Sequence, residues 1–301
     1  MGNHQKIAVI GLGSMGHGIA QACISAEHET HGFDVVPERV EQLQRQGGAR
    51  GELSDVAETV DTVIIVVLNA AQTEAVLFGE DGIANKLRKG ACIIACATVP
   101  PEFAIRMEAQ CAKLGLHYLD APISGGAAKA AMGSLSVMAA GTDEAFDAAR
   151  VALDAISETV FHLGDKAGPG SAMKAVNQLL AGVHIATMAE ALTFGMTQGI
   201  TPAKFLDVIK QCAGTSWMLE NRAPHIVVGD YTPKSQVNIW PKDLGIVLDV
   251  AKSAGFEAPI TETALAQFKA AAEMGLGHVD DAAVAKVYAQ QAGLTLPEPK
   301  K

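Results

Sequence analysis

The stretch KIAVIGLGSMGHGIAQACISA, residues 6–26, decides the fold of the first half of the chain. An apolar run is followed by a Gly-x-Gly-x-x-Gly fingerprint and then by a helical pattern. In such a fingerprint, the first glycine permits a tight turn, the second lets the backbone approach a pyrophosphate, and the third allows close helix–strand packing. This strand–loop–helix context predicts a dinucleotide site, whereas a glycine-rich turn without a ligand is the alternative. The residues of the fingerprint are Gly11, Leu12, Gly13, Ser14, Met15 and Gly16.

Short apolar runs alternate with helical patterns as far as Gly164. The runs TVIIVVL from Thr62 and ACIIACA from Ala91 are continuously apolar, which is typical of strands buried on both faces of a parallel sheet. Each run is followed by a helical segment. Residues 1–165 are therefore predicted to form an α/β Rossmann domain with a doubly wound, mostly parallel sheet.

Beyond Gly168 the strand patterns stop and helical periodicity continues to Tyr288. Residues 166–301 are predicted to form an all-α domain for substrate binding and oligomerisation. A long interdomain helix over about 170–198 would join it to the first domain, and we expect the Lys, Asn and Gln in that helix to exclude a membrane span. The segments 239–251 and 259–272 hold more apolar residues than one core needs, which favours an oligomer.

Composition excludes several classes of function. The net charge of -10 and the absence of a basic run argue against a nucleic-acid binder. Five scattered cysteines, without a zinc-ligand pattern, favour a reducing cytoplasm, and the N-terminal sequence lacks the organisation of a signal peptide. The histidines have no partners at metal-ligand spacing. We therefore expect a cytoplasmic protein with no metal, no nucleic acid and no membrane partner.

Asp34 ends the second predicted strand, eighteen positions after Gly16. A carboxylate there would accept hydrogen bonds from the ribose hydroxyls of NAD and repel the 2′-phosphate of NADP. The sequence thus favours NAD. The alternative is a solvated loop carboxylate.

Two further segments carry polar groups suited to chemistry. Ser124, Gly125 and Gly126 follow a predicted strand, and a turn of this kind can hold a carboxylate with its hydroxyl and N–H groups. Lys174, with Asn177 and Gln178, forms a polar patch on one face of the long helix. Taken alone, the glycine turn could serve conformation only, and Lys174 could be an ordinary surface lysine.

In combination, these motifs resemble the β-hydroxyacid dehydrogenase family over nearly the whole chain. The glycine fingerprint, DAPISGG at 120–126, GxxxGxGxxxK at 164–174 and Lys242-Asp243-Leu244 occur in the order and spacing of that family. The segments LNAAQTE at 68–74 and SWMLENR at 216–222 are most similar to its L-threonate-oxidising branch. Its 3-hydroxyisobutyrate dehydrogenases, its tartronate semialdehyde reductases and a non-catalytic dinucleotide-binding interaction module are the alternatives.

The resemblance implies a role for each matching residue. Lys174 would be the general acid/base, Ser124, Gly125 and Gly126 would hold the substrate carboxylate, and Asn177 and Gln178 would orient the substrate. It also implies a small hydroxy acid as substrate, NAD as cofactor and a homodimer or homotetramer. The cofactor would be contacted by the fingerprint residues, Asp34, Leu68, Asn69, Thr98 and Lys242.

Lys174 would have to be neutral to accept a hydroxyl proton while hydride leaves the adjacent carbon. Because a lysine near its ordinary pKa is a poor base at pH 7, its pKa would have to be lowered. Burial in a cleft between the domains, or the like charge of Lys242, would lower it.

Overall fold

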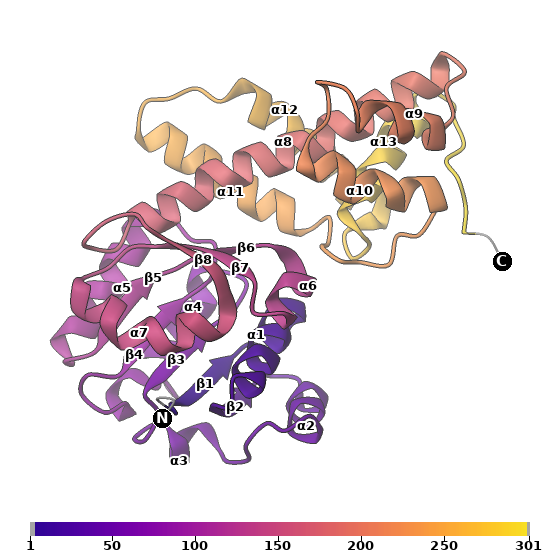
Figure 1. Ribbon diagram of the computed structural model, residues 1–301. Helices are drawn as coiled ribbons and strands as arrows, with labels where there is room; N and C mark the ends of the chain where they lie inside the picture. The colour runs from indigo at the N-terminus through magenta and orange to yellow at the C-terminus, as the bar shows by residue number, and fades with distance from the viewer. Residues whose placement is uncertain (1–3, 300–301) are drawn as a thin grey trace. The chain divides into compact units, whose positions relative to one another are not determined.

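The computed structural model describes residues 4–299 and divides into two compact units (Figure 1). The first unit extends through Lys174 and the second begins at Ala175, so the division falls inside helix α8 (Pro169–Thr197). The sequence placed it before residue 166. The difference arises because the first turn of α8 packs on strand ends of the first unit: a Cβ placed at Gly170 would lie 2.5 Å from the Asp120 carbonyl oxygen.

The first unit is built on a five-stranded, wholly parallel sheet with strand order β2-β1-β3-β4-β5. Every residue of β3 and β4 is buried, which confirms the prediction from the two continuous apolar runs. The strands are β1 (Lys6–Ile10), β2 (Glu29–Phe33), β3 (Thr62–Ile65), β4 (Cys92–Ala95) and β5 (His117–Asp120).

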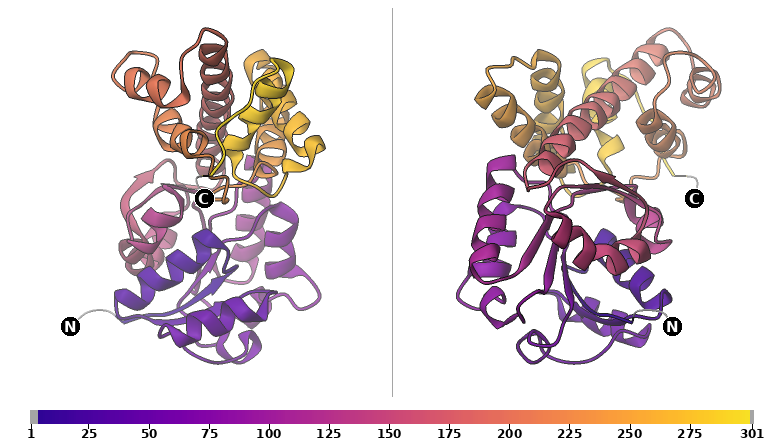
Figure 2. Two further views of the ribbon diagram at one scale, coloured as in Figure 1. Left: turned by 90° about the vertical axis from the view of Figure 1, so that its right-hand side faces the viewer. Right: turned by 60° about the vertical axis from the view of Figure 1, so that its left-hand side comes forward.

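Helices cover both faces of this sheet (Figures 1 and 2). Ile7 and Val9 of β1 pack with apolar residues of α1 and α7, whereas Ala8 and Ile10 point to the opposite face, which α4 and α5 cover. This two-sided burial produces the predicted doubly wound α/β domain. Its helices are α1 (Ser14–Ser25), α2 (Pro37–Arg45), α3 (Leu53–Val56), α4 (Ala70–Phe78), η1 (Ala84–Lys86), α5 (Pro101–Lys113), α6 (Gly126–Ala131) and α7 (Asp143–Ile156).

A second sheet of three strands follows in the same unit, in the order β6-β7-β8. The strands are β6 (Ile123–Ser124), β7 (Leu135–Ala139) and β8 (Ser157–His162). β6 is antiparallel to β7, and β8 is parallel to it. The sequence described 124–126 only as a turn and missed both β6 and α6, which are too short to show a periodic pattern.

The second unit is helical, and no strand occurs between residue 163 and residue 299, as predicted. Its elements after α8 are α9 (Pro202–Ile209), α10 (Trp217–Val228), α11 (Ile239–Ser253), α12 (Pro259–Ala271), η2 (Ala272–Leu276), η3 (Asp281–Val284) and α13 (Ala285–Gln291). Trp240 and Phe268, from the two segments that favoured an oligomer, are buried in the core of this unit. Part of their apolar surface therefore serves folding.

Helix α8 is long and apolar enough to cross a membrane by length and composition alone. We expected the Lys, Asn and Gln of this helix to exclude a membrane span, but the helix still meets the length and hydropathy requirements for one. Half of the apolar window is buried inside the structure, and Ile185 and Met188 lie in the core of the second unit. This burial gives a physical reason for its apolar character.

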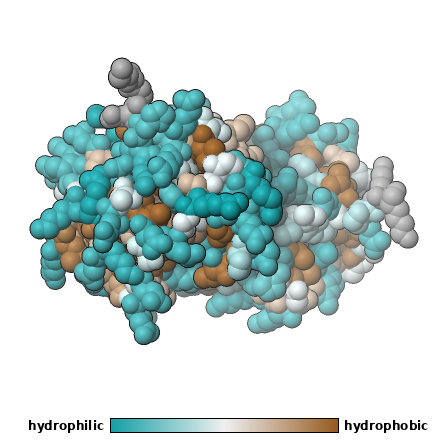
Figure 3. Space-filling view, turned by 90° about the horizontal axis from the view of Figure 1, so that it is seen from below, coloured by the Kyte–Doolittle hydropathy of each residue, from teal (hydrophilic) through white to brown (hydrophobic). Residues whose placement is uncertain are grey.

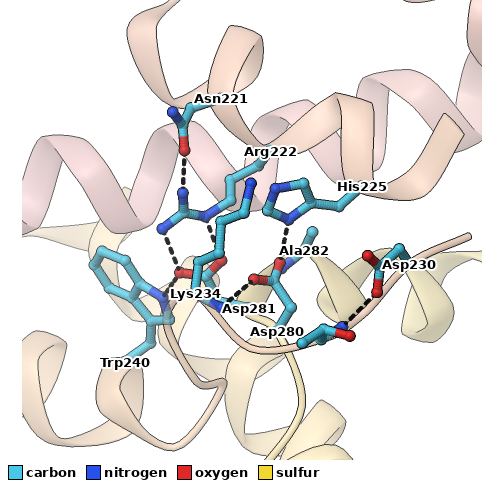
Figure 4. Close-up of polar contacts among 10 residues, drawn as sticks. Asn221, Arg222, His225, Asp230, Lys234, Trp240, Asp280, Asp281 and Ala282 are labelled. Carbon is cyan, nitrogen blue, oxygen red and sulfur yellow. Dashed lines mark hydrogen bonds and ion pairs between the residues drawn. The ribbon is translucent and has the colours of Figure 1, made fainter. Parts of the chain in front are cut away.

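A buried polar cluster ties α10, α11 and η3 together (Figure 4). Arg222 of α10 donates from Nε to Asp281 Oδ1 at 2.5 Å, and Trp240 of α11 donates from Nε1 to Asp281 Oδ2 at 3.0 Å. The imidazole of His225 lies 2.8 Å from Asp280 Oδ1. Because both aspartates are fully buried, removal of a partner would leave an uncompensated charge, which is strongly destabilising.

Candidate active site

Two glycines of the loop between β1 and α1 are required because the chain's own backbone lies too close for a side chain. Gly11 has φ +93°, and a Cβ there would lie 2.4 Å from the carbonyl oxygen of Val66. A Cβ at Gly16 would lie 1.8 Å from the carbonyl oxygen of Gly11. Neither position can carry a side chain without moving the backbone, so both glycines fix how closely α1 and the end of β3 approach the loop.

Gly13 is different, because a Cβ placed there would meet nothing within 4 Å. It is the N-cap residue of α1, and no side chain caps this helix. Ser14 and Met15 form the first turn. The loop therefore leaves open space beside the N-terminal N–H groups of α1, which suits a pyrophosphate. These residues fit the nucleotide that the fingerprint predicts.

The other predicted cofactor residues follow the carboxyl ends of neighbouring strands. Leu68 and Asn69 follow β3, and Thr98 follows β4. Since β2 and β3 flank β1 on opposite sides, the chain reverses direction across the sheet at β1, where open α/β sheets bind ligands. Asn69 caps α4 by accepting the Gln72 N–H, and Gln72 Oε1 accepts the Leu68 N–H at 2.8 Å. This segment is thus held in a defined turn.

Asp34 follows β2, but it is not the solvated loop carboxylate of the alternative interpretation, since its side chain is 5% exposed. Its Oδ2 accepts the Leu12 N–H at 2.6 Å, and its Oδ1 accepts the Val36 N–H at 2.9 Å. Arg39 lies 3.3 Å from both oxygens. Asp34 therefore ties the glycine loop to the end of β2 and also pairs with a cation that the sequence did not assign to it.

Ser124, Gly125 and Gly126 lie where β6 passes into α6. Gly125 has φ +139° and Gly126 has φ +78°, conformations that L side chains rarely adopt. A Cβ at Gly126 would meet nothing within 4 Å. The turn therefore requires glycine for its conformation and leaves open space beside one of its peptide groups.

Lys174 lies next to this turn. Its side chain is buried, and Nζ donates a hydrogen bond to the carbonyl oxygen of Ile123 at 2.8 Å. Ile123 directly precedes Ser124, so the structure brings the predicted acid/base residue and the predicted carboxylate turn together within the first unit. It is therefore not the solvated surface lysine of the alternative interpretation.

Asn177, Gln178 and Lys242 lie in the second unit and are linked to one another. Asn177 Nδ2 donates to Gln178 Oε1 at 2.9 Å, and Gln178 Nε2 donates to Asp243 Oδ2 at 2.5 Å. Lys242 Nζ lies 2.6 Å from the other oxygen of Asp243. The sequence included Asp243 in a motif without giving it a role, but the structure makes it the residue that joins α8 to α11.

Asp120 and Ser171 lie within two of the sequence motifs, but the sequence indicated no role for either residue. Both are 1% exposed, and Ser171 Oγ donates to Asp120 Oδ1 at 2.6 Å. Sequence alone offered one signal, a carboxylate at the end of a buried strand, but it gave no indication of the partner. Among residues 4–299, no group of three or more His, Cys, Asp or Glu side chains could hold a metal ion.

Family models match nearly the whole chain. Residues 6–164 match the NAD binding domain of 6-phosphogluconate dehydrogenase, and residues 168–288 match the NAD-binding domain of NADP-dependent 3-hydroxyisobutyrate dehydrogenase. The two matched segments are separated only by residues 165–167.

Curated proteins and solved structures agree with these models. An L-threonate dehydrogenase of Pectobacterium atrosepticum is 45% identical over 297 residues, 98% of this chain and 97% of that protein. A 3-hydroxyisobutyrate dehydrogenase of Pseudomonas aeruginosa is 33% identical, covering 94% of this chain and 98% of that protein. A crystal structure described as 3-hydroxyisobutyrate dehydrogenase from Salmonella typhimurium has a TM-score of 0.89 at 43% identity, covering 93% of this chain and 99% of that one.

These similarities confirm the predicted family, the α/β and all-α architecture and the NAD cofactor, and they set aside the non-catalytic interaction module. The chain belongs to the 3-hydroxyisobutyrate dehydrogenase-like family of NAD-dependent hydroxyacid dehydrogenases.

Proposed function

We propose that this dehydrogenase oxidises L-threonate to 2-dehydro-L-erythronate, with Lys174 as the general acid/base. The observation that carries the mechanism is the 2.8 Å hydrogen bond from Lys174 Nζ to the Ile123 carbonyl oxygen. This bond supports the proposal because Ile123 directly precedes Ser124, Gly125 and Gly126, which would form the carboxylate-binding turn. A hydroxyl close to the carboxylate of the substrate is therefore the one that Lys174 would reach.

Each group then has a defined task. The Ser124 hydroxyl and the N–H groups of Gly125 and Gly126 bind the carboxylate, and Lys174 accepts the hydroxyl proton as the carbon is oxidised. Bound NAD supplies the hydride acceptor. In the reverse direction, protonated Lys174 donates to the developing alkoxide. By family resemblance, Asn177 and Gln178 contact the substrate, and the fingerprint residues, Asp34, Leu68, Asn69, Thr98 and Lys242 contact the cofactor.

The choice of substrate is supported by the relatives. Five L-threonate dehydrogenases are 42–46% identical to this chain over 97–99% of its length. The 3-hydroxyisobutyrate dehydrogenase of Pseudomonas aeruginosa is only 33% identical, whereas the Salmonella typhimurium structure with that description is 43% identical, so 3-hydroxyisobutyrate is the main competing substrate. The L-threonate-type segments at 68–74 and 216–222 point the same way.

Initial rates test the substrate assignment directly. L-threonate, D-threonate, D-glycerate and 3-hydroxyisobutyrate are compared with NAD and with NADP, and reduction of tartronate semialdehyde is measured with NADH. We expect the highest kcat/KM with L-threonate and NAD. Equal or better rates with another hydroxy acid would reject L-threonate while leaving the dehydrogenase class intact. Preference for NADP would contradict the role of Asp34 in cofactor choice.

We further propose that the enzyme is a cytoplasmic homodimer or homotetramer. All five cysteines are free, as in a reducing compartment. Several apolar side chains of the second unit are more than half exposed, including Phe194, Phe256 and Ile260. The face shown in Figure 3 is mostly hydrophilic with separate apolar patches. Sedimentation velocity of the full chain is expected to give twice or four times the 31.2 kDa mass of one chain, and a monomer at assay concentration would contradict this.

A further inference from the structure

We propose that Asp120 and Ser171 are positioning residues that fix Lys174 against the carboxylate-binding turn. This inference rests on the proposed role of Lys174 as acid/base. Neither residue is assigned a contact with the substrate or the cofactor. They would act through the backbone of α8, whose first turn they hold on the end of β5.

Asp120 ends β5 and uses both carboxylate oxygens on the start of α8. Oδ2 accepts the N–H groups of Gly168 and Ser171, both at 2.9 Å. Oδ1 accepts the Ser171 hydroxyl at 2.6 Å. Burial raises the pKa of Asp120, and these hydrogen bonds oppose that rise. A buried carboxylate thus satisfies N–H groups that the helix itself leaves unpaired, and it does so from a rigid strand end.

The first turn of α8 also packs too closely against the strand ends to shift freely. A Cβ at Gly170 would lie 2.5 Å from the carbonyl oxygen of Asp120 and 2.6 Å from that of Met138. The helix backbone therefore lies directly against the ends of β5 and β7. Just before the helix, the Ala167 N–H donates to Glu108 Oε1 at 2.9 Å, which holds the entering chain on α5.

The hydrogen bond of Lys174 follows the same spacing as the bond between Asp120 and Ser171. Asp120 bonds Ser171, and three residues later on both segments Ile123 bonds Lys174. The helix and the strand-to-turn segment are thus joined at two points one helical turn apart. Loss of the first link would let the start of α8 shift and displace Nζ from the Ile123 carbonyl, although Lys174 itself is retained. Misplacement of a reacting group by about 1 Å can reduce the rate about 100-fold.

Ser171→Ala, Asp120→Asn and Asp120→Ala test the inference in the full chain. Ser171→Ala removes one hydrogen bond, and we expect kcat to fall about 10-fold with NAD affinity unchanged, as for other supporting contacts. Asp120→Asn keeps one acceptor oxygen, so we expect it to retain more activity than Asp120→Ala, whose kcat should fall about 100-fold.

A second readout does not depend on turnover. Lys174 Nζ, once displaced, should react faster with acetic anhydride, and mass spectrometry can follow this reaction against exposed Lys166 in the same protein. Thr142→Ala is the matched control, because Thr142 caps α7 in the same unit by accepting the Ala145 N–H. We expect that variant to change thermal stability but neither kcat nor Lys174 labelling.

The outcomes separate this inference from the proposed function. If Lys174→Ala loses turnover while Ser171→Ala and both Asp120 variants keep wild-type kcat and labelling, the positioning role is wrong and the acid/base role stands. If Lys174→Ala keeps turnover, the acid/base role of Lys174 is wrong, and the positioning role that depends on it is wrong as well. An effect of Ser171→Ala on stability alone, equal to that of Thr142→Ala, would also overturn the inference.

Discussion

Lys174→Ala is expected to lower kcat for the hydroxy acid about 1,000-fold, within the range that a positioned acid/base group contributes. NAD should bind with unchanged affinity, because the glycine loop proposed to hold the pyrophosphate is supported by its own backbone contacts. Steady-state kinetics and fluorescence titration of NAD measure the two effects separately. Added ethylamine should partly restore turnover by replacing the missing amine.

Two further variants make this result interpretable. Lys174→Met keeps most of the buried side-chain volume without the amine, so it should be as inactive as the alanine variant but more stable. Lys166→Ala removes an exposed lysine shortly before α8 and should retain full activity. Loss of a positioned acid/base group should reduce turnover far more than about fivefold. If Lys174→Ala retained turnover within about fivefold of wild type, the assignment of Lys174 would be refuted.

The sequence predicted the first unit well because its signals are local. A strand buried on both faces is continuously apolar, as in β3 and β4, and the glycine fingerprint fixes a strand, a turn and a helix within about 20 residues. Lys174 and the turn at 124–126 could also be proposed as a pair, but only through the order of motifs in a known family. Lys174 and Ile123, the residue before the turn, are 51 positions apart, and this separation carries no periodic signal of its own.

The features that sequence reasoning missed are long-range polar contacts. Asp120 with Ser171, and Gln178 with Asp243, are pairs of residues 51 and 65 positions apart. Asp281 with Arg222 spans 59 positions. Aspartate and arginine are usually exposed, so a single sequence gives no reason to place them in a core. Each pair became visible only when packing brought its two segments together.

The pairing of Asp34 with Arg39 shows that a single sequence can also fail to reveal a polar contact between residues close together in the chain. The two residues are only five positions apart, but nothing in the sequence pattern indicated that their side chains would pair. The structure has the guanidinium against both oxygens. The carboxylate that we propose favours NAD is therefore partly balanced within the chain, so we expect cofactor preference to depend on this pair and on the Leu12 N–H together.

Gly13→Val is expected to weaken NAD binding at least about 100-fold while leaving the fold intact. A Cβ at this position would meet nothing within 4 Å, and the valine side chain would extend into the open space beside the N-terminus of α1. Two lost hydrogen bonds to a charged group, at roughly 1.5–3 kcal/mol each, correspond to about 100-fold or more in affinity. Calorimetric titration of NAD measures the loss, and thermal unfolding of the apo-protein should match wild type.

Gly16→Ala is the contrasting variant, since its Cβ would lie 1.8 Å from the Gly11 carbonyl oxygen. Overpacking of this kind typically costs about 1–3 kcal/mol, so this variant should lose thermal stability even without cofactor. The pair separates two uses of glycine in one loop, because Gly16 is required by the protein's own backbone, whereas we expect Gly13 to be required by the ligand. If Gly13→Val bound NAD normally, the pyrophosphate would have to lie elsewhere. If both variants lost stability equally, Gly13 would be a structural glycine as well, and the open space beside it would not identify the cofactor site.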